Sequence, residues 1–364
     1  MNIGYNFPNL RGLYLGMNQF SGQIPSSIYK CGRLEDVALY LNNFTGSLPR
    51  ELGNLSNLRR LFVYKNFLTG TIPTSTGNLS NLMLIDLGEN YITGEIPREL
   101  GYLQNLQLLI FEGNILTGSI PKGVFNISAL EISDLHSNCL SGPLPSNTGH
   151  SLHQLKELYL ANNGLSGPIP ASISNASQLT LLDLARNSFN GPIPTSLGNL
   201  QQLRILNLAH NQPTSQLGTP EIVNLIALSL FDNEINGVIP LTIQGLKKLQ
   251  RLYLDANNLK GSIPNGICSL TQLGELDLFE NKLVGQIPNC IGNLRQLQML
   301  FIRSNMLTSP MPLSLWTIPN LLYLNLSDNS LHESLPAEVG NLKTLVQLDI
   351  SRESVIWQHS KYHW

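Results

Sequence analysis

An asparagine recurs at nearly constant intervals along this 364-residue chain, and this repeat restricts the possible folds more than any other feature. Successive asparagines are 24 residues apart, except for one interval of 25, from Asn138 to Asn163, and one of 22, from Asn211 to Asn233. Self-similarity at a fixed period of roughly 20 to 50 residues is the signature of a repeat architecture. The recurring residues are Asn18, Asn42, Asn66, Asn90, Asn114, Asn138, Asn163, Asn187, Asn211, Asn233, Asn257, Asn281, Asn305 and Asn329.

Each repeat follows the pattern L-x-x-L-x-L-x-x-N-x-L-x-G-x-I-P-x-x-L-G-N-L-x-x, as residues 82–103 illustrate. Before the asparagine, apolar residues alternate with polar or small ones, and this period of two predicts a short strand with one buried face. We expect the amide of Asn90 to satisfy backbone groups of the turn, which would otherwise be buried unpaired. Gly94 allows the chain to approach the neighbouring repeat closely or to adopt a positive φ. Pro97 and Gly101 mark the start and end of a short helical turn.

A single repeat cannot bury its apolar face alone, so stacked neighbours must share one core. We therefore predict an α/β repeat fold, with a parallel sheet on the concave side and short helical or 3-10 turns on the convex side. Residues 1–350 form this solenoid, with fourteen full repeats and a partial one, and residues 351–364 form a non-repeat tail. The segment 212–224 lacks the G-x-I-P pattern and is expected to be irregular.

The charge and composition exclude several classes of partner. The 22 Lys and Arg residues against 24 Asp and Glu residues give a net charge of 22 − 24 = −2, so the chain has no electrostatic reason to bind nucleic acid. No window supplies the roughly 20 apolar residues that a membrane helix needs. The N-terminus shows no signal peptide, and we expect no cofactor.

The repeat unit resembles the plant-specific class of leucine-rich repeats, through L-T/S-G-x-I-P followed by x-x-L-G-N-L over about residues 7–350. Phrases such as FNISAL (125–130), LSGPLPSN (140–147) and LLYLNLSDNSL (321–331) are similar to receptor-like kinases of the immune subfamily that includes the flagellin receptor. The resemblance implies a right-handed leucine-rich-repeat solenoid on the extracellular side of the plasma membrane. It also implies a peptide or protein ligand, with a co-receptor kinase ectodomain as a second candidate partner.

The sequence departs from that family in ways that leave alternatives open. The paired-cysteine caps and the kinase motifs G-x-G-x-x-G-x-V, H-R-D-L and D-F-G do not occur. We therefore interpret the chain as a non-enzymatic ectodomain fragment involved in immune or developmental signalling. The alternatives are a secreted inhibitor of a microbial cell-wall-degrading enzyme such as polygalacturonase, or a non-functional truncated receptor paralogue.

The outward strand positions carry the candidate binding residues, because aromatic residues and arginine are enriched at binding hot spots. An alternative that the sequence leaves open is that the aromatics serve only strand propensity and stacking. Between the two candidate patches the same positions are acidic, with Asp86, Glu89, Glu112, Asp134, Glu157 and Asp183. The first patch comprises Phe231, Arg251, Tyr253, Asp255, Asp277, Phe279, Phe301 and Arg303, and the second comprises Tyr40, Arg60, Phe62 and Tyr64.

The histidines, the cysteines and the glycosylation sequons support fewer expectations. No catalytic arrangement is visible, and the seven histidines show no metal-ligand spacing. Cys268 and Cys290 lie 22 residues apart on neighbouring coils; a disulfide is conceivable, but we favour buried free thiols. Asn325 is also a sequon, but it falls on a predicted strand, where a glycan would obstruct a ligand. The sequons expected to accept glycans are Asn43, Asn54, Asn78, Asn126 and Asn175.

Overall fold

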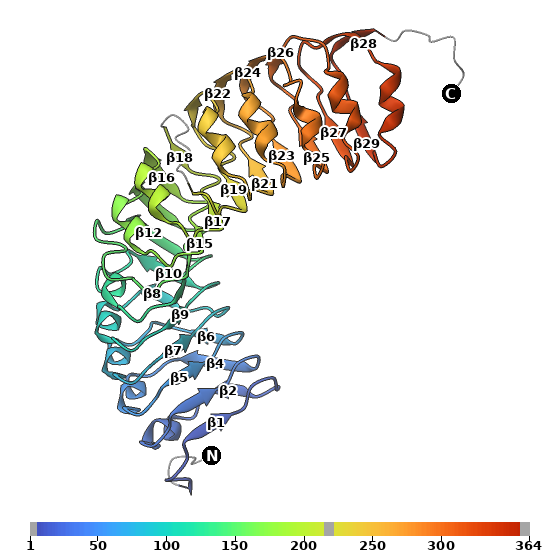
Figure 1. Cartoon of the computed structure of the whole chain (residues 1–364). Coiled ribbons are helices and arrows are strands. Elements are labelled where there is room, and N and C mark those ends of the chain that lie inside the picture. The colour runs from blue at the N-terminus through green and yellow to red at the C-terminus, as the bar shows by residue number, and fades with distance from the viewer. Residues whose placement is uncertain (1–5, 215–221, 357–364) are drawn as a thin grey trace. The chain divides into compact units, whose positions relative to one another are not determined.

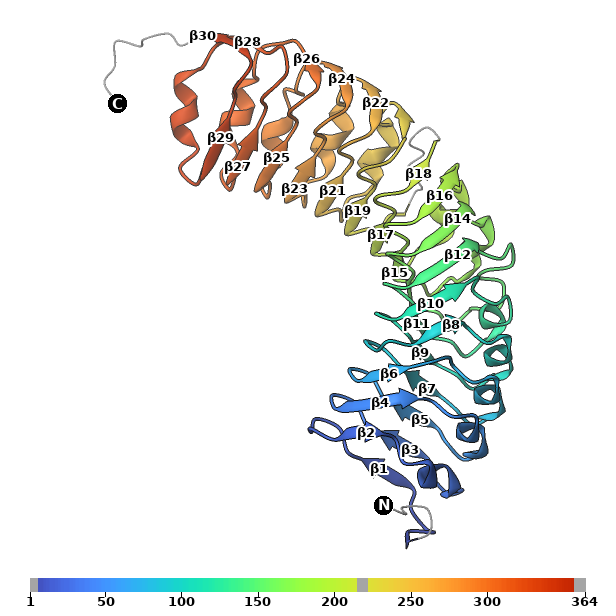
Figure 2. The ribbon, with the colours of Figure 1, turned by 180° about the vertical axis from the view of Figure 1, so that it is seen from behind.

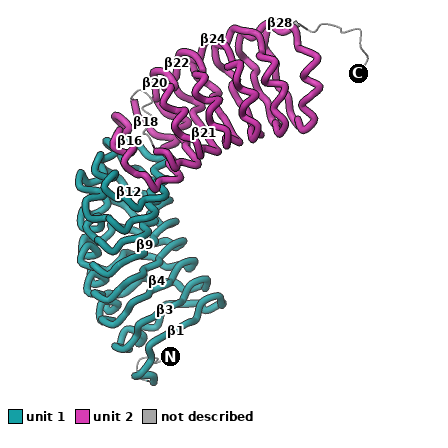
Figure 3. The backbone as a smooth tube through the Cα atoms, in the orientation of Figure 1, with its two compact units in different colours: residues 1–189 teal, residues 190–364 magenta. Residues whose placement is uncertain are grey.

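A computed structural model describes residues 6–214 and 222–356 (Figure 1). The chain divides into two compact units, Met1–Phe189 and Asn190–Trp364, here called unit 1 and unit 2 (Figure 3). Most of the segment predicted to be irregular, at 215–221, and the end of the predicted tail, at 357–364, lie outside the described residues.

In unit 1, one short strand of each repeat pairs in parallel with the equivalent strand of the next repeat. The register keeps the repeats in phase, since Leu61 lies opposite Ile85 and Ile85 lies opposite Leu109. Figures 1 and 2 show these strands on one side of the unit and its helical turns on the other. The strands are β1 (Gly12–Tyr14), β3 (Asp36–Ala38), β5 (Arg60–Phe62), β7 (Leu84–Asp86), β9 (Leu108–Ile110), β11 (Ile132–Asp134), β13 (Glu157–Tyr159) and β15 (Leu181–Asp183).

Unit 2 repeats the same arrangement, with every described neighbour pair parallel and in phase. The predicted fold class, a leucine-rich-repeat solenoid with a parallel sheet, is therefore confirmed. The strands of this sheet are β17 (Ile205–Asn207), β19 (Ala227–Ser229), β21 (Arg251–Tyr253), β23 (Glu275–Asp277), β25 (Met299–Phe301), β27 (Tyr323–Asn325) and β29 (Gln347–Asp349).

A second strand, of two to five residues, follows the repeated asparagine and pairs in parallel with the equivalent strand of a neighbouring repeat. In unit 1 and at its boundary these strands are β2 (Ser21–Gln23), β4 (Asn43–Ser47), β6 (Phe67–Thr69), β8 (Thr93–Glu95), β10 (Ile115–Gly118), β12 (Cys139–Pro143), β14 (Gly164–Pro168) and β16 (Ser188–Gly191). In unit 2 they are β18 (Gln212–Pro213), β20 (Asn236–Gly237), β22 (Asn258–Gly261), β24 (Lys282–Gly285), β26 (Met306–Leu307), β28 (His332–Ser334) and β30 (Ser354–Ile356).

The helical turns with described bounds are all short 3-10 turns, and most follow directly after a proline. None of them has the length and apolar character that a bilayer-crossing helix would need in the described residues. In unit 1 they are η1 (Ser26–Lys30), η2 (Arg50–Asn54), η3 (Thr74–Asn78), η4 (Arg98–Tyr102), η5 (Val124–Asn126) and η6 (Ala171–Asn175). In unit 2 they are η7 (Thr195–Asn199), η8 (Leu241–Gly245), η9 (Asn265–Ser269), η10 (Ile291–Asn293), η11 (Leu313–Thr317) and η12 (Ala337–Asn341).

Two glycines of the repeat have different physical roles. Gly94 has a φ of 78°, a conformation that a side chain disfavours. Gly101 instead lies inside η4, where an added Cβ would come within 2.7 Å of the Gly123 backbone in the next repeat. The second glycine is therefore required by the close stacking of neighbouring turns.

The core of each unit lies between its sheet and its turns. Leu100 of η4 and Leu109 of β9 are fully buried in unit 1, as are Leu103 and Leu106 between them, so this repeat contributes leucines from both its turn and its strand. Because equivalent leucines of successive repeats stack, the apolar surface of one repeat is buried by the next.

The repeated asparagine joins neighbouring repeats through its side-chain amide. The amide nitrogen of Asn90 lies 3.0–3.1 Å from the carbonyl oxygens of Val63, Leu87 and Gly88. Its amide oxygen accepts the backbone N–H of Leu68 at 3.0 Å. Asn90 is only 5% exposed, so these four backbone groups have no ready access to water if the amide is removed.

The chain continues the repeat beyond residue 350, in residues that the sequence pattern assigns to a tail. β30 pairs with β28, and Glu353 takes the position of the repeated asparagine. Its carboxylate accepts the backbone N–H groups of Asn329 and Leu331, both at 2.6 Å. A carboxylate can replace the amide here because only its accepting function is used.

The expectation of free thiols at Cys268 and Cys290 is wrong, because the two cysteines form a disulfide. Cys268 lies in η9 and Cys290 immediately precedes η10. Neighbouring turns stack closely enough that their Cα atoms are 5.7 Å apart, within the range that a disulfide spans. Cys31 is free and buried, and Cys139 is free and exposed.

We expect Cys290→Ser to lower the stability of unit 2 by about 2–3 kcal/mol, because the disulfide closes a loop and restricts the unfolded chain. Chemical denaturation under oxidising conditions measures the change, with Cys139→Ser, at an exposed free cysteine, as the matched control. Adding a reductant should remove the difference between wild type and Cys290→Ser. Equal stability without the reductant would contradict this role.

Candidate ligand-binding face

The candidate residues lie on what we call the ladder face, the solvent side of the odd-numbered strands and of the residues leading to the repeated asparagine. Side chains of a strand point alternately to its two sides. In β21, Leu252 is fully buried, whereas Arg251 and Tyr253 on either side of it reach solvent. The alternation thus separates the core from the ladder face.

The structure brings the first predicted patch together on four neighbouring strands of unit 2. Tyr253 on β21 lies opposite Asp277 on β23, which lies opposite Phe301 on β25. A second row contains the residue two positions after β19, β21, β23 and β25. We call the whole set the unit 2 cluster: Phe231, Arg251, Tyr253, Asp255, Asp277, Phe279, Phe301 and Arg303.

Several members of the unit 2 cluster have partners on adjacent repeats. The Tyr253 hydroxyl donates a hydrogen bond to the carboxylate of Glu275. The guanidinium of Arg303 lies over the Phe279 ring, 4.3 Å from its centroid, a cation–π arrangement. These contacts hold the aromatic side chains in place on the face.

A histidine that the sequence patterns did not single out also belongs to this region. The His210 ring meets the Phe231 ring edge to face, with 4.8 Å between centroids, and its Nδ1 bonds the Asp232 carboxylate. His210 occupies the position just before the repeated asparagine, so comparing that position across repeats is the signal that would have revealed it.

Two carboxyl groups of the unit 2 cluster titrate far above the ordinary range. Burial, followed by the charge of Asp277, raises the pKa of Asp255 to about 7. Burial also raises the pKa of Asp277 to about 6, although the backbone N–H of Phe279 and the charge of Arg303 oppose this. The face is therefore less negative near neutral pH than its composition indicates.

Arg251 and Arg303 are exposed cations of the unit 2 cluster, and of the two Arg303 already lies over the Phe279 ring. Among the described residues, the Arg251 side chain forms no ion pair and no hydrogen bond. Its five N–H donors are therefore available for a planar acceptor such as a carboxylate.

The second patch, in unit 1, has its cation already paired. Arg60 donates to both oxygens of Asp36, at 2.6 and 2.8 Å, and this pairing lowers the pKa of Asp36. The rings of Tyr40 and Tyr64 stack with 4.9 Å between centroids, and Phe62 meets Tyr40 edge to face. This patch therefore presents stacked rings, beside a groove of about 400 Å³ that Arg60 and Asp36 help to line.

The acidic stretch of unit 1 is partly neutralised by burial and by pairing. Burial raises the pKa of Asp86 to about 6 and that of Glu112 to about 7. His136 bonds Asp134 through Nδ1 at 2.6 Å, a contact that raises the pKa of His136. The Tyr159 hydroxyl donates to Glu157 at 2.9 Å.

The sequons lie away from the ladder face. All five expected acceptors are exposed, and Asn54, Asn78, Asn126 and Asn175 are the last residues of η2, η3, η5 and η6. Asn325 instead lies on β27 and bonds Asp349 and Ser327 across the ladder face. Glycans at the expected positions would leave the ladder face open, whereas one at Asn325 would cover it.

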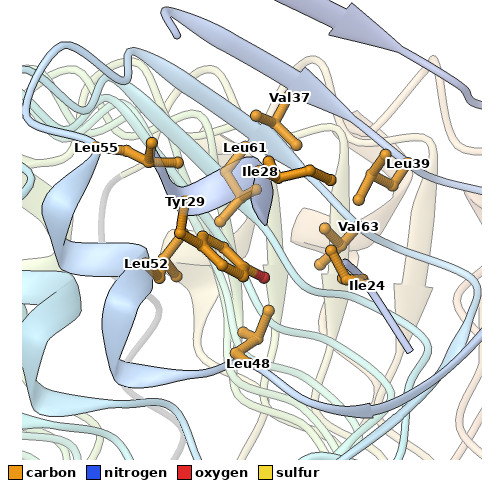
Figure 4. Close-up of a pocket in the computed structure, with 10 residues that line it drawn as sticks. All are labelled: Ile24, Ile28, Tyr29, Val37, Leu39, Leu48, Leu52, Leu55, Leu61 and Val63. Carbon is orange, nitrogen blue, oxygen red and sulfur yellow. The ribbon is translucent and has the colours of Figure 1, made fainter. Parts of the chain in front are cut away.

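An enclosed cavity in unit 1 is too small to serve as a ligand site. It holds about 10 Å³ of free space between apolar side chains, enough for one water molecule at most. Figure 4 shows Tyr29 lying among Leu48 and Leu52 in its wall. No group of histidine, cysteine and carboxylate side chains suited to a metal ion occurs in 6–214 or 222–356.

The chain is similar to known proteins built from the same repeat. It matches the Leucine Rich Repeat family over residues 9–31, 81–103, 154–176, 178–200, 248–270, 272–294 and 320–342. A Leptospira interrogans leucine-rich-repeat protein, LIC12759, shares 31% identity over 93% of this chain and 83% of its own, with a TM-score of 0.74. No curated protein matches the chain.

Plant receptor ectodomains are also similar. The plant peptide hormone receptor RGFR1, solved with RGF2, shares 34% identity over 97% of this chain, with a TM-score of 0.94. The Arabidopsis receptor kinase HAESA ectodomain, solved with an IDA peptide hormone, shares 30% identity over 97% of this chain, with a TM-score of 0.82. This chain spans 57% and 63% of those two structures.

Proposed function

Because this chain belongs to the leucine-rich-repeat family, we propose that it is the ligand-recognition part of a plant receptor-like Ser/Thr kinase. In this proposal it binds an extended peptide along the ladder face of unit 2. The similarity to RGFR1 and HAESA, whose structures contain peptide hormones, supports the proposal. Its described residues consist of repeats and resemble non-catalytic ectodomains, so binding is the activity proposed for this region.

The unit 2 cluster is the observation that carries this proposal. Phe231, Tyr253, Phe279 and Phe301 lie on successive repeats, with strands about 4.8 Å apart. Regularly spaced rings of this kind suit stacking against an extended chain. The guanidinium of Arg251, which pairs with no described residue, can hold a ligand carboxylate in a bidentate contact.

The signalling role, the co-receptor and the location of the protein are proposed from less specific observations. We place the receptor in immune or developmental signalling, in the subfamily that includes the flagellin receptor, because of the sequence phrases described above. A HAESA structure also contains the co-receptor SERK1, which supports a co-receptor ectodomain as a second partner. Exposed sequons and the disulfide at Cys268 and Cys290 support a location outside the cell.

We expect Tyr253→Ala and Phe279→Ala each to weaken peptide binding about thirtyfold, because truncating an aromatic anchor costs about 2 kcal/mol. Calorimetry with peptides selected from a random library against the full chain measures this loss. Tyr159→Ala is the matched control, since Tyr159 occupies the same strand position in unit 1 and also donates to a glutamate. Equal, small losses in all three variants would contradict the proposed site.

A further inference from the structure

Asp255 is largely buried, and the one hydrogen-bond donor given for its carboxylate in the described residues is its own backbone N–H. It is 9% exposed, yet among the described residues its carboxylate forms no ion pair and no hydrogen bond with another residue. A buried carboxylate normally acquires a cation or several donors, because leaving it unpaired is costly. As the outward-facing residue that follows β21, it faces the ladder surface and not the core.

The residues on either side of Asp255 are aromatic. The backbone N–H of Asp232 bonds the Asp255 carbonyl, and that of Ala256 bonds the Phe279 carbonyl, so Asp255 is in register between Phe231 and Phe279. Aromatic ring faces attract cations. Phe279 already binds one, the guanidinium of Arg303.

The charges around this position favour a cation further. Besides burial, which raises the pKa of Asp255 most, the charges of Asp277, Asp232 and Glu280 raise it further. Asp232 also bonds His210, and Glu275 is engaged by Tyr253. Arg303 is the nearby cation on the Phe279 ring, and it acts on Asp277. Asp255 thus feels the charge of several carboxylates, and no described cation pairs with it.

We propose that Asp255, between Phe231 and Phe279, is a subsite for a basic side chain of the peptide ligand, a lysine ammonium or an arginine guanidinium. The inference rests on the proposed function, because it assigns a charge to one position of the bound peptide. A ligand cation would supply the missing partner of the carboxylate while lying against the aromatic rings. The unit 2 cluster would then bind a basic residue of the peptide at Asp255 and a carboxylate of the peptide at Arg251.

The test begins with peptides selected from a random library against the full chain at neutral pH. We expect enrichment of lysine or arginine at one position. Replacing that residue by norleucine or citrulline should weaken binding to wild type about tenfold or more, as expected for a hydrogen bond to a charged group. Asp255→Asn should weaken binding of the basic peptide to the same extent and leave binding of the neutral peptide unchanged.

The controls distinguish this inference from the proposed function. Asp328→Asn removes an exposed carboxyl elsewhere in unit 2 and should bind both peptides as wild type does. One outcome would overturn the cation subsite alone. In that outcome the selected peptides bind the chain and bind Phe279→Ala more weakly, but they show no preference for a basic residue. The cation subsite would also be overturned if Asp255→Asn still bound the basic peptide more tightly than its norleucine or citrulline analogue by the same factor as wild type. Failure to select any peptide would overturn both proposals.

Discussion

Replacing Asn90 by alanine is expected to lower the stability of unit 1 by about 4 kcal/mol. The amide of Asn90 serves three carbonyl oxygens and one backbone N–H across two repeats. Leaving a buried polar group without a partner costs about 1–3 kcal/mol, and alanine supplies neither donor nor acceptor. Denaturant-induced unfolding followed by circular dichroism measures the change.

Asn105 provides the matched control for this substitution. Its side chain is exposed and donates one hydrogen bond, to the carbonyl of Ser80 at 2.9 Å in the preceding repeat. Asn105→Ala should therefore cost about 1 kcal/mol or less. If both alanine variants unfold at the same denaturant concentration, the repeated asparagine does not have the structural role assigned to it.

The folded chain is expected to lose stability as the pH rises from about 4 to about 8. Burial raises the pKa of Asp86 and Asp277 to about 6, and that of Glu112 and Asp255 to about 7. These groups ionise at lower pH when unfolded, so over this range the folded state binds more protons and stability falls as pH rises. His136, whose pKa is also raised, acts in the same direction.

The size of this effect follows from the pKa shifts, reduced for solvent access. One pKa unit corresponds to about 1.4 kcal/mol, but screening weakens the effect at partly exposed groups. We expect about 4 kcal/mol from the four carboxyls together. Melting temperatures measured across the pH range test this directly.

Neutral variants identify the responsible groups. Asp255→Asn and Glu112→Gln should stabilise the chain near pH 8 and leave it unchanged near pH 4, because they remove a carboxyl that resists ionisation. Asp328→Asn, at an exposed position, serves as the control and should produce the smaller change. A melting temperature that rises with pH over this range would contradict the prediction.

The fold was predictable because its determinants recur in most repeats. A strand with alternating apolar residues, an asparagine, a glycine and a proline appear at fixed spacing, and each repeat buries its leucines only against an equivalent neighbour. Parallel pairing in phase follows from that requirement alone. The placement of Arg251, Tyr253 and Phe279 on the ladder face follows from the strand alternation.

The candidate site was less predictable, because its chemistry depends on contacts between side chains of adjacent repeats. Arg60 and Arg251 occupy the same strand position, yet Arg60 is held by Asp36, whereas Arg251 pairs with no described residue. Sequence spacing places both on the face but does not give the distance to a neighbouring carboxylate. The burial of Asp255 is likewise a property of its neighbours in three dimensions.

The sequence by itself determined the solenoid, its register and the set of residues on the ladder face, because these follow from periodicity. Only the tertiary structure showed the bridge between Cys268 and Cys290, the continuation of the repeat at Glu353, and the left-handed residue before each asparagine, such as Glu89 with a φ of 47°. The disulfide and the bonds of Glu353 depend on how closely one turn stacks on the next. That distance sets which cysteines, carboxyls and backbone groups meet, and no spacing along the chain specifies it.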